Sequence, residues 1–112
     1  AGQPLSLVTG GIHITQPVFV RDLARTMLDS VNREGAFQQI FCIGGPEAVE
    51  NRLYYEILGR LLGVEITIRE LPLTGYLEAH PEYSGHLCHR IYDLSKLKAA
   101  GIQLPDTPMA EA

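Results

Sequence analysis

The chain has no tryptophan, only two cysteines and no long apolar run. Two cysteines, Cys42 and Cys88, are too few for a disulfide scaffold and are typical of a reducing compartment. No segment approaches the roughly 18 apolar residues of a membrane span, and the N-terminus lacks the basic start and apolar core of a secretory signal. The sequence therefore predicts a cytoplasmic protein with no membrane partner.

Positive charge is scarce as well. Nine lysines and arginines stand against thirteen acidic residues, which gives a formal net charge of -4 at pH 7. The basic residues are scattered, so no broad basic face is available to neutralise the phosphates of DNA or RNA. We expect no nucleic-acid partner.

The 112 residues, 46% of them hydrophobic, are enough for one modest globule with a thin core. Segments with the periodicity of strands and of helices alternate along the chain. This order favours an α/β fold with about three helices and short strands, as part of a larger parallel sheet.

The first helix is marked by Leu23, Met27 and Val31, which recur at four-residue steps and form one apolar stripe. Asp22 lies in its first turn, where a carboxylate suits the helix dipole. Gly35 follows its end, where glycine suits a left-handed exit. Both residues are expected to have structural roles. In a small domain, such a stripe ordinarily contributes to the chain's own core.

A strand, a turn and a second helix are predicted next. The apolar run 40–43 gives the strand, Gly44 and Gly45 give a tight turn, and a four-residue apolar repeat gives the helix. That repeat consists of Val49, Leu53, Ile57 and Leu61. The glycine pair matches neither GxGxxG nor GxxxxGK[ST], so a phosphate-binding loop is not expected there.

Three shorter elements complete this pattern. Residues 5–9 form an apolar, strand-like run. Residues 64–69 alternate apolar and polar side chains, as in a strand with one wet face, and Pro72 closes them. A short helix is predicted from Thr74 to Ala79.

The last predicted helix is short and begins near Asp93, which stands where an N-cap residue is expected. Leu97 should point inward, and Gly101 follows the end. Tyr92 and Lys96 have the YxxxK spacing of a tyrosine that acts as acid or base beside a lysine. Tyr92 precedes the cap, however, and would not share a helix face with Lys96, so a surface role is expected for both.

The segment "HPEYSGHLCHR" collects four residues of the types that bind zinc, histidine and cysteine. These residues are His80, His86, Cys88 and His89. Alternation on a strand would place His86 and Cys88 on one face and His89 on the other. Structural zinc sites use more regular paired spacings. Histidines that line a polar cleft, or that are simply solvated, are therefore the preferred interpretations, with a small zinc module as an alternative.

Taken in order, four segments resemble the C-terminal region of the extended short-chain dehydrogenase/reductase superfamily, which includes NAD-dependent epimerases, dehydratases and sugar-nucleotide reductases. "QPVFVRDLA" resembles a joint between a strand and a helix, "IFCIGG" a strand, "YYEILGRLLG" the next helix, and "YDLSKLKAAGIQLP" the family's ending. The matched positions are Pro17, Val20, Asp22, Leu23, Ala24, Asp93, Ser95, Lys96, Leu97, Gly101 and Pro105.

This resemblance implies a two-part enzyme. A Rossmann half would carry the glycine-rich NAD loop and the catalytic YxxxK, and a C-terminal half would fold over the substrate. Residues 1–112 would be a single C-terminal substrate-binding fragment, with no catalytic, cofactor-binding or metal-binding residues and no activity alone, because neither the dinucleotide fingerprint nor the catalytic helix is present. Val18, Val20, Leu23 and Met27 would then face the Rossmann domain of the parent chain.

Few of the family's substrate-binding residues have a match in this chain. Many members that bind nucleotide sugars have an arginine where this chain has Thr15, and an R-P-G-H motif where it has "YSGH", with Tyr83 for the arginine. Without these two arginines, the chain lacks the bidentate hydrogen bonds by which arginine usually binds a diphosphate, which argues against a nucleotide-sugar substrate. We expect substrate contacts from Tyr83, His86, His89 and Arg90.

The preferred hypothesis is the substrate-binding C-terminal fragment of an NAD(P)-dependent epimerase, dehydratase or reductase acting on a sugar or other hydroxylated carbonyl substrate. The parent would bind NAD or NADP and use its tyrosine as acid or base in hydride transfer. Dimers are common in the superfamily, so a homodimer of the parent is also expected. The alternative is a free-standing, non-enzymatic binding or interaction module.

Overall fold

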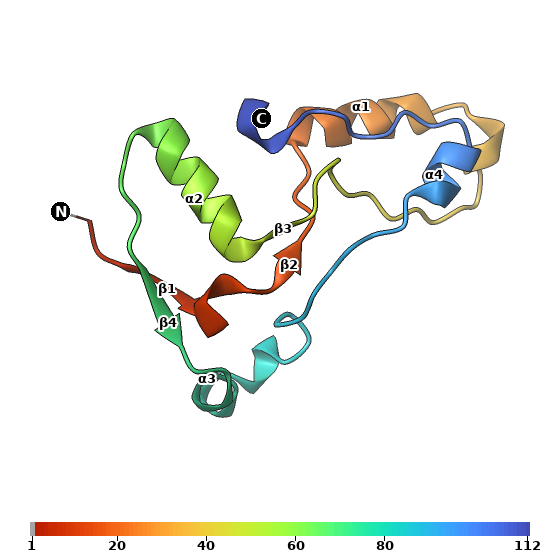
Figure 1. Ribbon diagram of the computed structural model, residues 1–112. Helices are drawn as coiled ribbons and strands as arrows, with labels where there is room; N and C mark the ends of the chain where they lie inside the picture. Colours follow the sequence, from red (N-terminus) through yellow and green to blue (C-terminus); the bar gives the residue numbers. More distant parts are fainter. Residues whose placement is uncertain (1) are drawn as a thin grey trace. The chain divides into compact units, whose positions relative to one another are not determined.

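The computed structural model describes residues 2–112, a small mixed α/β chain (Figure 1). Its strands are β1 (Leu5–Val8), β2 (Ile14–Thr15), β3 (Val49–Glu50) and β4 (Ile68–Leu71), and its α-helices are α1 (Val20–Ser30), α2 (Asn51–Leu62), α3 (Leu73–Ala79) and α4 (Ser95–Ala99). Contacts divide the chain into two compact units. The first unit contains the segment ending at Thr15 together with Val49–Arg90, and the second contains Gln16–Ala48 together with Ile91–Ala112.

Two pairs of strands organise the first unit. β1 runs parallel to β4, with Leu5 opposite Ile68 and Val8 opposite Leu71, and Leu7 is buried. β2 runs antiparallel to β3, with Ile14 opposite Glu50. The strand predicted for residues 5–9 is therefore confirmed.

The second predicted strand of this unit begins later than expected. Only the end of the 64–69 segment enters β4, which Pro72 follows as expected. Val64 instead donates its N–H to the carbonyl of Gly59 at 2.9 Å. This bond closes the left-handed exit of α2 at Gly63, whose φ is +66°. Because Val64 belongs to this helix-terminal turn, its side chain does not join the strand's inward face and is exposed.

The second unit is built from α1, α4 and the C-terminal segment, which runs back beside α1 (Figure 1). α1 confirms the helix predicted from the apolar repeat, and α4 confirms the short helix predicted from its end signals. Asp93 accepts the N–H of Ser95 at 2.9 Å, close to the predicted capping role. Leu97 is 2% exposed, as predicted.

The exit from α1 differs from the expectation. Gly35 has no positive φ, and the left-handed residue is Asn32, with φ 59°. Asparagine tolerates this conformation because its short polar side chain makes local hydrogen bonds. Gly35 lies against Ala100 instead, where an added Cβ would be 3.4 Å from the Ala100 carbonyl oxygen. The absence of a side chain at Gly35 therefore allows close packing against Ala100.

The two sides of α1 have opposite environments. The apolar face of α1, comprising Val20, Ala24, Met27, Leu28 and Val31 at its end, is exposed, and its four large side chains are between 60% and 73% exposed. On the opposite side, Asp22 and Thr26 are each 2% exposed. Leu23, which the predicted stripe included, is only partly exposed, as is Val18 before the helix. The apolar face as defined here does not contribute to a core within the described chain, contrary to the usual behaviour of a small domain.

The strand predicted at residues 40–43 is wrong for this chain. The segment has no regular structure, and no described strand pairs with it. The Nζ of Lys96 donates to the carbonyl of Ile40 at 2.9 Å. A strand requires a neighbour for its main-chain groups, and the described residues supply none.

Gly44 and Gly45, which follow this segment, are small because neighbouring atoms lie too close for a side chain, and not because they form a hydrogen-bonded turn. A Cβ at Gly45 would lie 1.9 Å from the carbonyl oxygen of Pro17, and a Cβ at Gly44 would lie 2.7 Å from the side chain of Gln16. Gln16 also donates from Nε2 to the carbonyl of Gly45 at 2.7 Å. Any larger residue would push these two segments apart.

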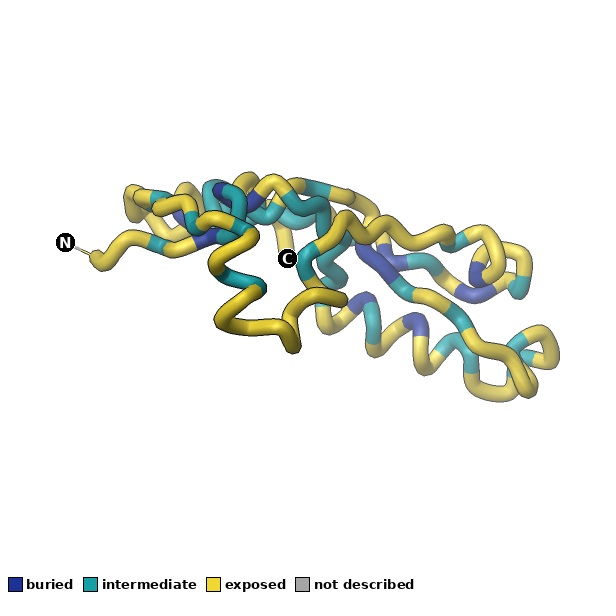
Figure 2. Tube along the Cα trace, turned by 90° about the horizontal axis from the view of Figure 1, so that it is seen from below, coloured by how far each residue is buried: buried dark blue, intermediate teal, exposed yellow. Residues whose placement is uncertain are grey.

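Burial is limited in both units, as the short blue stretches of Figure 2 show. The large aliphatic side chains buried within the described chain are Leu7, Leu97 and Ile102. A search of residues 2–112 found no helix whose length and apolar character would let it cross a membrane.

Candidate functional site

Four rings lie close together in the segment that follows β4, and two of them belong to predicted substrate residues. This ring cluster consists of Tyr76, His80, Tyr83 and His86. The first two lie on α3 and at its end, Tyr83 ends the 3-10 helix Pro81–Tyr83, and His86 lies in the turn that follows.

Main-chain hydrogen bonds bring these rings to one side of the segment. The N–H of His80 donates to the carbonyl of Tyr76 at 2.8 Å, that of Tyr83 to His80 at 3.1 Å, and that of His86 to Tyr83 at 2.8 Å. Each bond closes a turn of three or four residues, so each ring follows the last by about one helical turn.

Tyr83 is at the centre of the ring cluster. Its ring centroid lies 5.9 Å from Tyr76, 6.0 Å from His80 and 6.2 Å from His86, and the closest pair is Tyr76 with His80 at 4.8 Å. These separations are those of attractive edge-to-face and tilted ring pairs. Tyr83 is 42% exposed, and both histidines are exposed. The cluster is therefore accessible to a ligand.

The other two predicted residues, His89 and Arg90, contact β2. The Nδ1 of His89 accepts the N–H of Ile14 at 3.0 Å, and the N–H of Arg90 donates to the carbonyl of Ile14 at 2.9 Å. The guanidinium of Arg90 also donates to the carbonyl of Gly85. The structure therefore joins Tyr83 with His86, and His89 with Arg90.

The bond from Ile14 sets the tautomer of neutral His89. Because Nδ1 accepts, the ring proton is on Nε2, which offers a donor and not a lone pair. The ring of His13 lies 5.7 Å from that of His89. A donor suits a hydroxyl or carbonyl oxygen, whereas a metal ion requires a lone pair.

The strand geometry assumed for the histidine-rich segment is wrong. Residues 84–88 form turns and a bend, and the Sγ of Cys88 points back to the carbonyl of Gly85 at 3.8 Å. Pro81 and Gly85 within this segment favour turns over a strand. Across residues 2–112, no three His, Cys, Asp or Glu side chains converge as ligands for a metal ion.

Tyr92 and Lys96, the residues with YxxxK spacing, are not paired with each other. The Nζ of Lys96 lies 5.3 Å from the ring centroid of Phe41 and donates to Ile40. A lysine that assists a tyrosine must lie within reach of its hydroxyl. Both side chains are exposed, as predicted for surface residues.

Two open hollows lie away from the predicted site residues. One, of about 350 Å³, is lined by Glu56, Gly59, Arg60, Val64, Glu65 and Ile66. The other, of about 520 Å³, is lined by Ser30, Asn32, Arg33, Glu34, Ala36 and Phe37. Charged groups line both, and neither contains a ring of the ring cluster.

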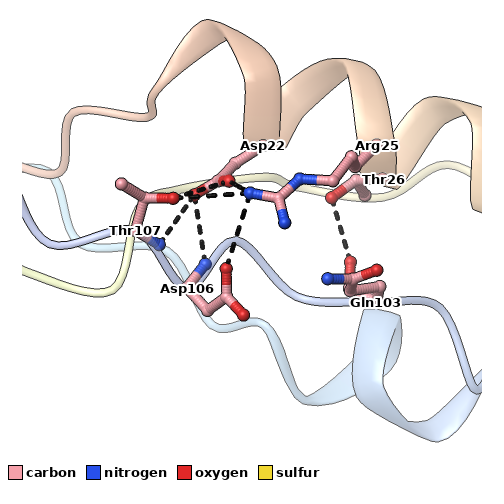
Figure 3. Close-up of polar contacts among 6 residues, drawn as sticks. All are labelled: Asp22, Arg25, Thr26, Gln103, Asp106 and Thr107. Carbon is pink, nitrogen blue, oxygen red and sulfur yellow. Dashed lines mark hydrogen bonds and ion pairs between the residues drawn. The ribbon is translucent and has the colours of Figure 1, made fainter. Parts of the chain in front are cut away.

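A buried carboxylate on α1 has a role that the helix-dipole interpretation missed. The Oδ2 of Asp22 accepts the N–H groups of Asp106 at 3.2 Å and Thr107 at 2.8 Å, while its Oδ1 accepts the Thr107 hydroxyl at 2.9 Å and pairs with Arg25 (Figure 3). Every donor is internal to the second unit. Asp22 therefore holds the C-terminal segment on α1.

Two further residues extend this arrangement along the same side of α1. The hydroxyl of Thr26 donates to the carbonyl of Gln103 at 2.9 Å (Figure 3), and the Oδ2 of Asp29 accepts the N–H of Gln103 at 2.7 Å. Asp22, Thr26 and Asp29, the polar face of α1, are spaced by four and three residues, which is the period of a helix face. That polar spacing was the available sequence signal.

The ionisation of both carboxylates is tied to these contacts. Burial raises the pKa of Asp22, but the N–H and hydroxyl of Thr107 and the Arg25 guanidinium together lower it further, so that it lies below the ordinary value of 3.8. The Arg33 guanidinium, and then the N–H of Gln103, hold the pKa of Asp29 below the same value. Both side chains are therefore charged at neutral pH.

Comparisons of this chain with protein-family models and with curated proteins found no match in either set.

Proposed function

We propose that these residues are the substrate-binding C-terminal part of an NAD(P)-dependent epimerase, dehydratase or reductase of the extended short-chain dehydrogenase/reductase superfamily. The parent acts in the cytoplasm on a sugar or another hydroxylated carbonyl compound. A Rossmann domain of the same parent chain holds the dinucleotide and supplies the tyrosine that exchanges a proton during hydride transfer.

The exposed apolar face of α1 is the observation that supports this proposal most strongly. Its large side chains are between 60% and 73% exposed, while Asp22 and Thr26 on the opposite side are buried under the C-terminal segment. A contiguous apolar surface of this kind marks an interaction site. We assign it to the Rossmann domain, the neighbour that the resemblance implies.

The irregular segment at residues 40–43 supports the same assignment. Its sequence is apolar, and Ile40 is 87% exposed. Its main chain has no strand partner within residues 2–112. A sheet edge in the Rossmann domain would provide both the hydrogen bonds and the apolar cover that this segment lacks.

In this proposal, Tyr83, His86, His89 and Arg90 contribute substrate contacts from the first unit. The Nε2–H of His89 is suited to an oxygen of a hydroxylated carbonyl compound. No catalytic group is assigned to these 112 residues.

Dinucleotide binding by the parent and by the isolated chain tests this division of labour. We expect the parent to bind NAD or NADP saturably and the isolated chain not to bind, as measured by isothermal titration calorimetry. The reading frame upstream should encode a glycine-rich loop and a YxxxK motif. Micromolar dinucleotide binding by the isolated chain, or a parent without these motifs, would contradict the proposal.

A further inference from the structure

We infer that the ring cluster of Tyr76, His80, Tyr83 and His86 is a stacking site for a flat, neutral ring of the ligand, an aryl or conjugated cyclic carbonyl compound. This inference rests on the proposed function in treating that ligand as the substrate. It narrows the substrate class from hydroxylated carbonyl compounds in general to those that carry such a ring.

The arrangement of the rings is the first step. Tyr83 contacts the three other rings at 5.9, 6.0 and 6.2 Å, yet 42% of its surface remains exposed. An aromatic group whose neighbours are also aromatic presents a π surface that an added flat ring covers favourably. A purely structural cluster would instead be covered by apolar side chains from elsewhere in the chain.

The cluster is also held in place before any ligand arrives. Successive main-chain hydrogen bonds of 2.8, 3.1 and 2.8 Å connect Tyr76, His80, Tyr83 and His86. The ring of His80 is further fixed by Glu82, whose Oε1 lies 3.3 Å from its Nδ1. A site that is already ordered loses less conformational entropy on binding.

The charge around the cluster argues against a diphosphate. Residues 73–86 contain Glu78 and Glu82 and no lysine or arginine. A diphosphate would be repelled by the two carboxylates and would find no guanidinium on residues 73–86, and the nearby guanidinium of Arg90 already donates to the carbonyl of Gly85. A neutral ring avoids both costs.

Three probes separate stacking from other causes of binding. Acetophenone supplies a neutral ketone on an aromatic ring, cyclohexyl methyl ketone supplies the same ketone on a saturated ring, and inorganic pyrophosphate supplies the charged group alone. Each would be titrated into the full 112-residue chain at pH 7.5, and the aromatic NMR signals of Tyr83 and His86 would be followed. We expect saturable shifts with acetophenone, at least about tenfold weaker binding of the saturated ketone and no shift with pyrophosphate.

Variants at the centre of the cluster provide the decisive comparison. Tyr83→Phe keeps the π face and should retain acetophenone binding, whereas Tyr83→Leu keeps apolar bulk and should lose about tenfold in affinity. Tyr55→Ala is the matched control, because Tyr54 and Tyr55 form another ring pair, at 5.4 Å on α2. It should leave the affinity unchanged.

Three results would overturn the inference: equal binding of the two ketones, equal binding by Tyr83→Leu and the unchanged chain, or pyrophosphate binding with no response to acetophenone. The test involves no dinucleotide. A negative stacking result would therefore not contradict the proposed docking of α1 on a Rossmann domain. Conversely, if that docking proposal fails, a positive stacking result remains valid.

Discussion

Asp22 connects two parts of the chain that are far apart in sequence. It lies on α1, and its main-chain donors, Asp106 and Thr107, follow 84 and 85 residues later. A carboxylate has enough acceptor positions for all of these donors and Arg25, whereas an amide has one acceptor oxygen and directs its own N–H groups at them. The charge and the two oxygens of Asp22 are both required.

We therefore predict that Asp22→Asn lowers the thermal midpoint more than any other single carboxylate-to-amide change in the second unit. Leaving buried donors without an acceptor costs stability even though the side chain's shape is kept. Circular dichroism melts would measure the difference. Asp29→Asn is the matched control on the same helix, with a side chain that is 30% exposed. An equal loss in both variants would contradict the role assigned to burial.

The same contacts predict how stability depends on pH. The pKa values of Asp22, Asp29 and Asp93 are all lowered from 3.8. A carboxyl whose pKa is lower in the folded state stabilises the fold above its unfolded pKa, and this contribution is lost as the pH falls through the folded pKa. Stability from these groups should be constant above about pH 5 and should decrease below pH 4.

Chemical denaturation between pH 2.5 and pH 7 would measure this acid dependence. The Asp22→Asn variant should show a shallower decrease, since one of the lowered groups has been removed. A decrease that begins near pH 6 would point to histidines instead and would contradict the assignment to these carboxylates.

At the scale of elements, the approach of the two segments at Pro17 and Gly45 sets a strict size limit. An added Cβ at Gly45 would lie 1.9 Å from a main-chain oxygen, which cannot move as a side-chain end does. Gly45→Ala should therefore cost about 3 kcal/mol or more in the free energy of unfolding. Urea denaturation would measure the change.

Gly75 in α3 provides the control for that substitution. No atom lies within 4 Å of a Cβ built at this position, and alanine is favoured over glycine inside a helix by about 0.5–1 kcal/mol. Gly75→Ala should stabilise the chain. Similar effects of the two substitutions would show that the contact with Pro17 is not a constraint.

The sequence predicted those elements whose periodicity is local. α1 and α2 follow from apolar repeats, although Val49 of the second repeat lies in β3. α4 follows from its end signals and β1 from a short apolar run, because neighbouring residues alone decide such patterns. The strand prediction for residues 40–43 is wrong because strand formation depends on a partner that the local pattern does not contain. In α1, the apolar repeat identified the helix correctly but not which of its faces the chain itself buries.

Prediction of the candidate site was limited in a similar way. The family motif predicts Tyr83 and His86 as substrate residues but does not link them to Tyr76 and His80, and strand alternation is the wrong geometry for the histidine-rich segment. Spacings of four, three and three along Tyr76, His80, Tyr83 and His86 indicate successive turns. The bond from Ile14 to His89 joins residues 75 apart, which no local pattern reveals.

At the scale of the whole molecule, placing charge on the apolar face of α1 should affect the stability of the parent much more than that of the isolated chain. Met27 and Leu28 are 60% and 73% exposed. The double substitution Met27→Lys with Leu28→Lys should change the unfolding free energy of the isolated chain by no more than about 0.5 kcal/mol. It should also reduce self-association, as measured by sedimentation velocity.

In the parent, these two lysines would be placed against the Rossmann domain, where burying unpaired charge costs several kcal/mol. The parent's thermal midpoint and dinucleotide affinity should therefore fall. Leu61→Lys with Leu62→Lys on α2, whose leucines are 56% and 74% exposed, is the control with no assigned docking role. If the α1 double substitution destabilises the isolated chain as much as the parent, the face packs within these 112 residues and needs no other domain. If only the parent is destabilised, the apolar face of α1 must pack on a surface that the parent has and the isolated chain lacks. The proposed function identifies that surface as the Rossmann domain.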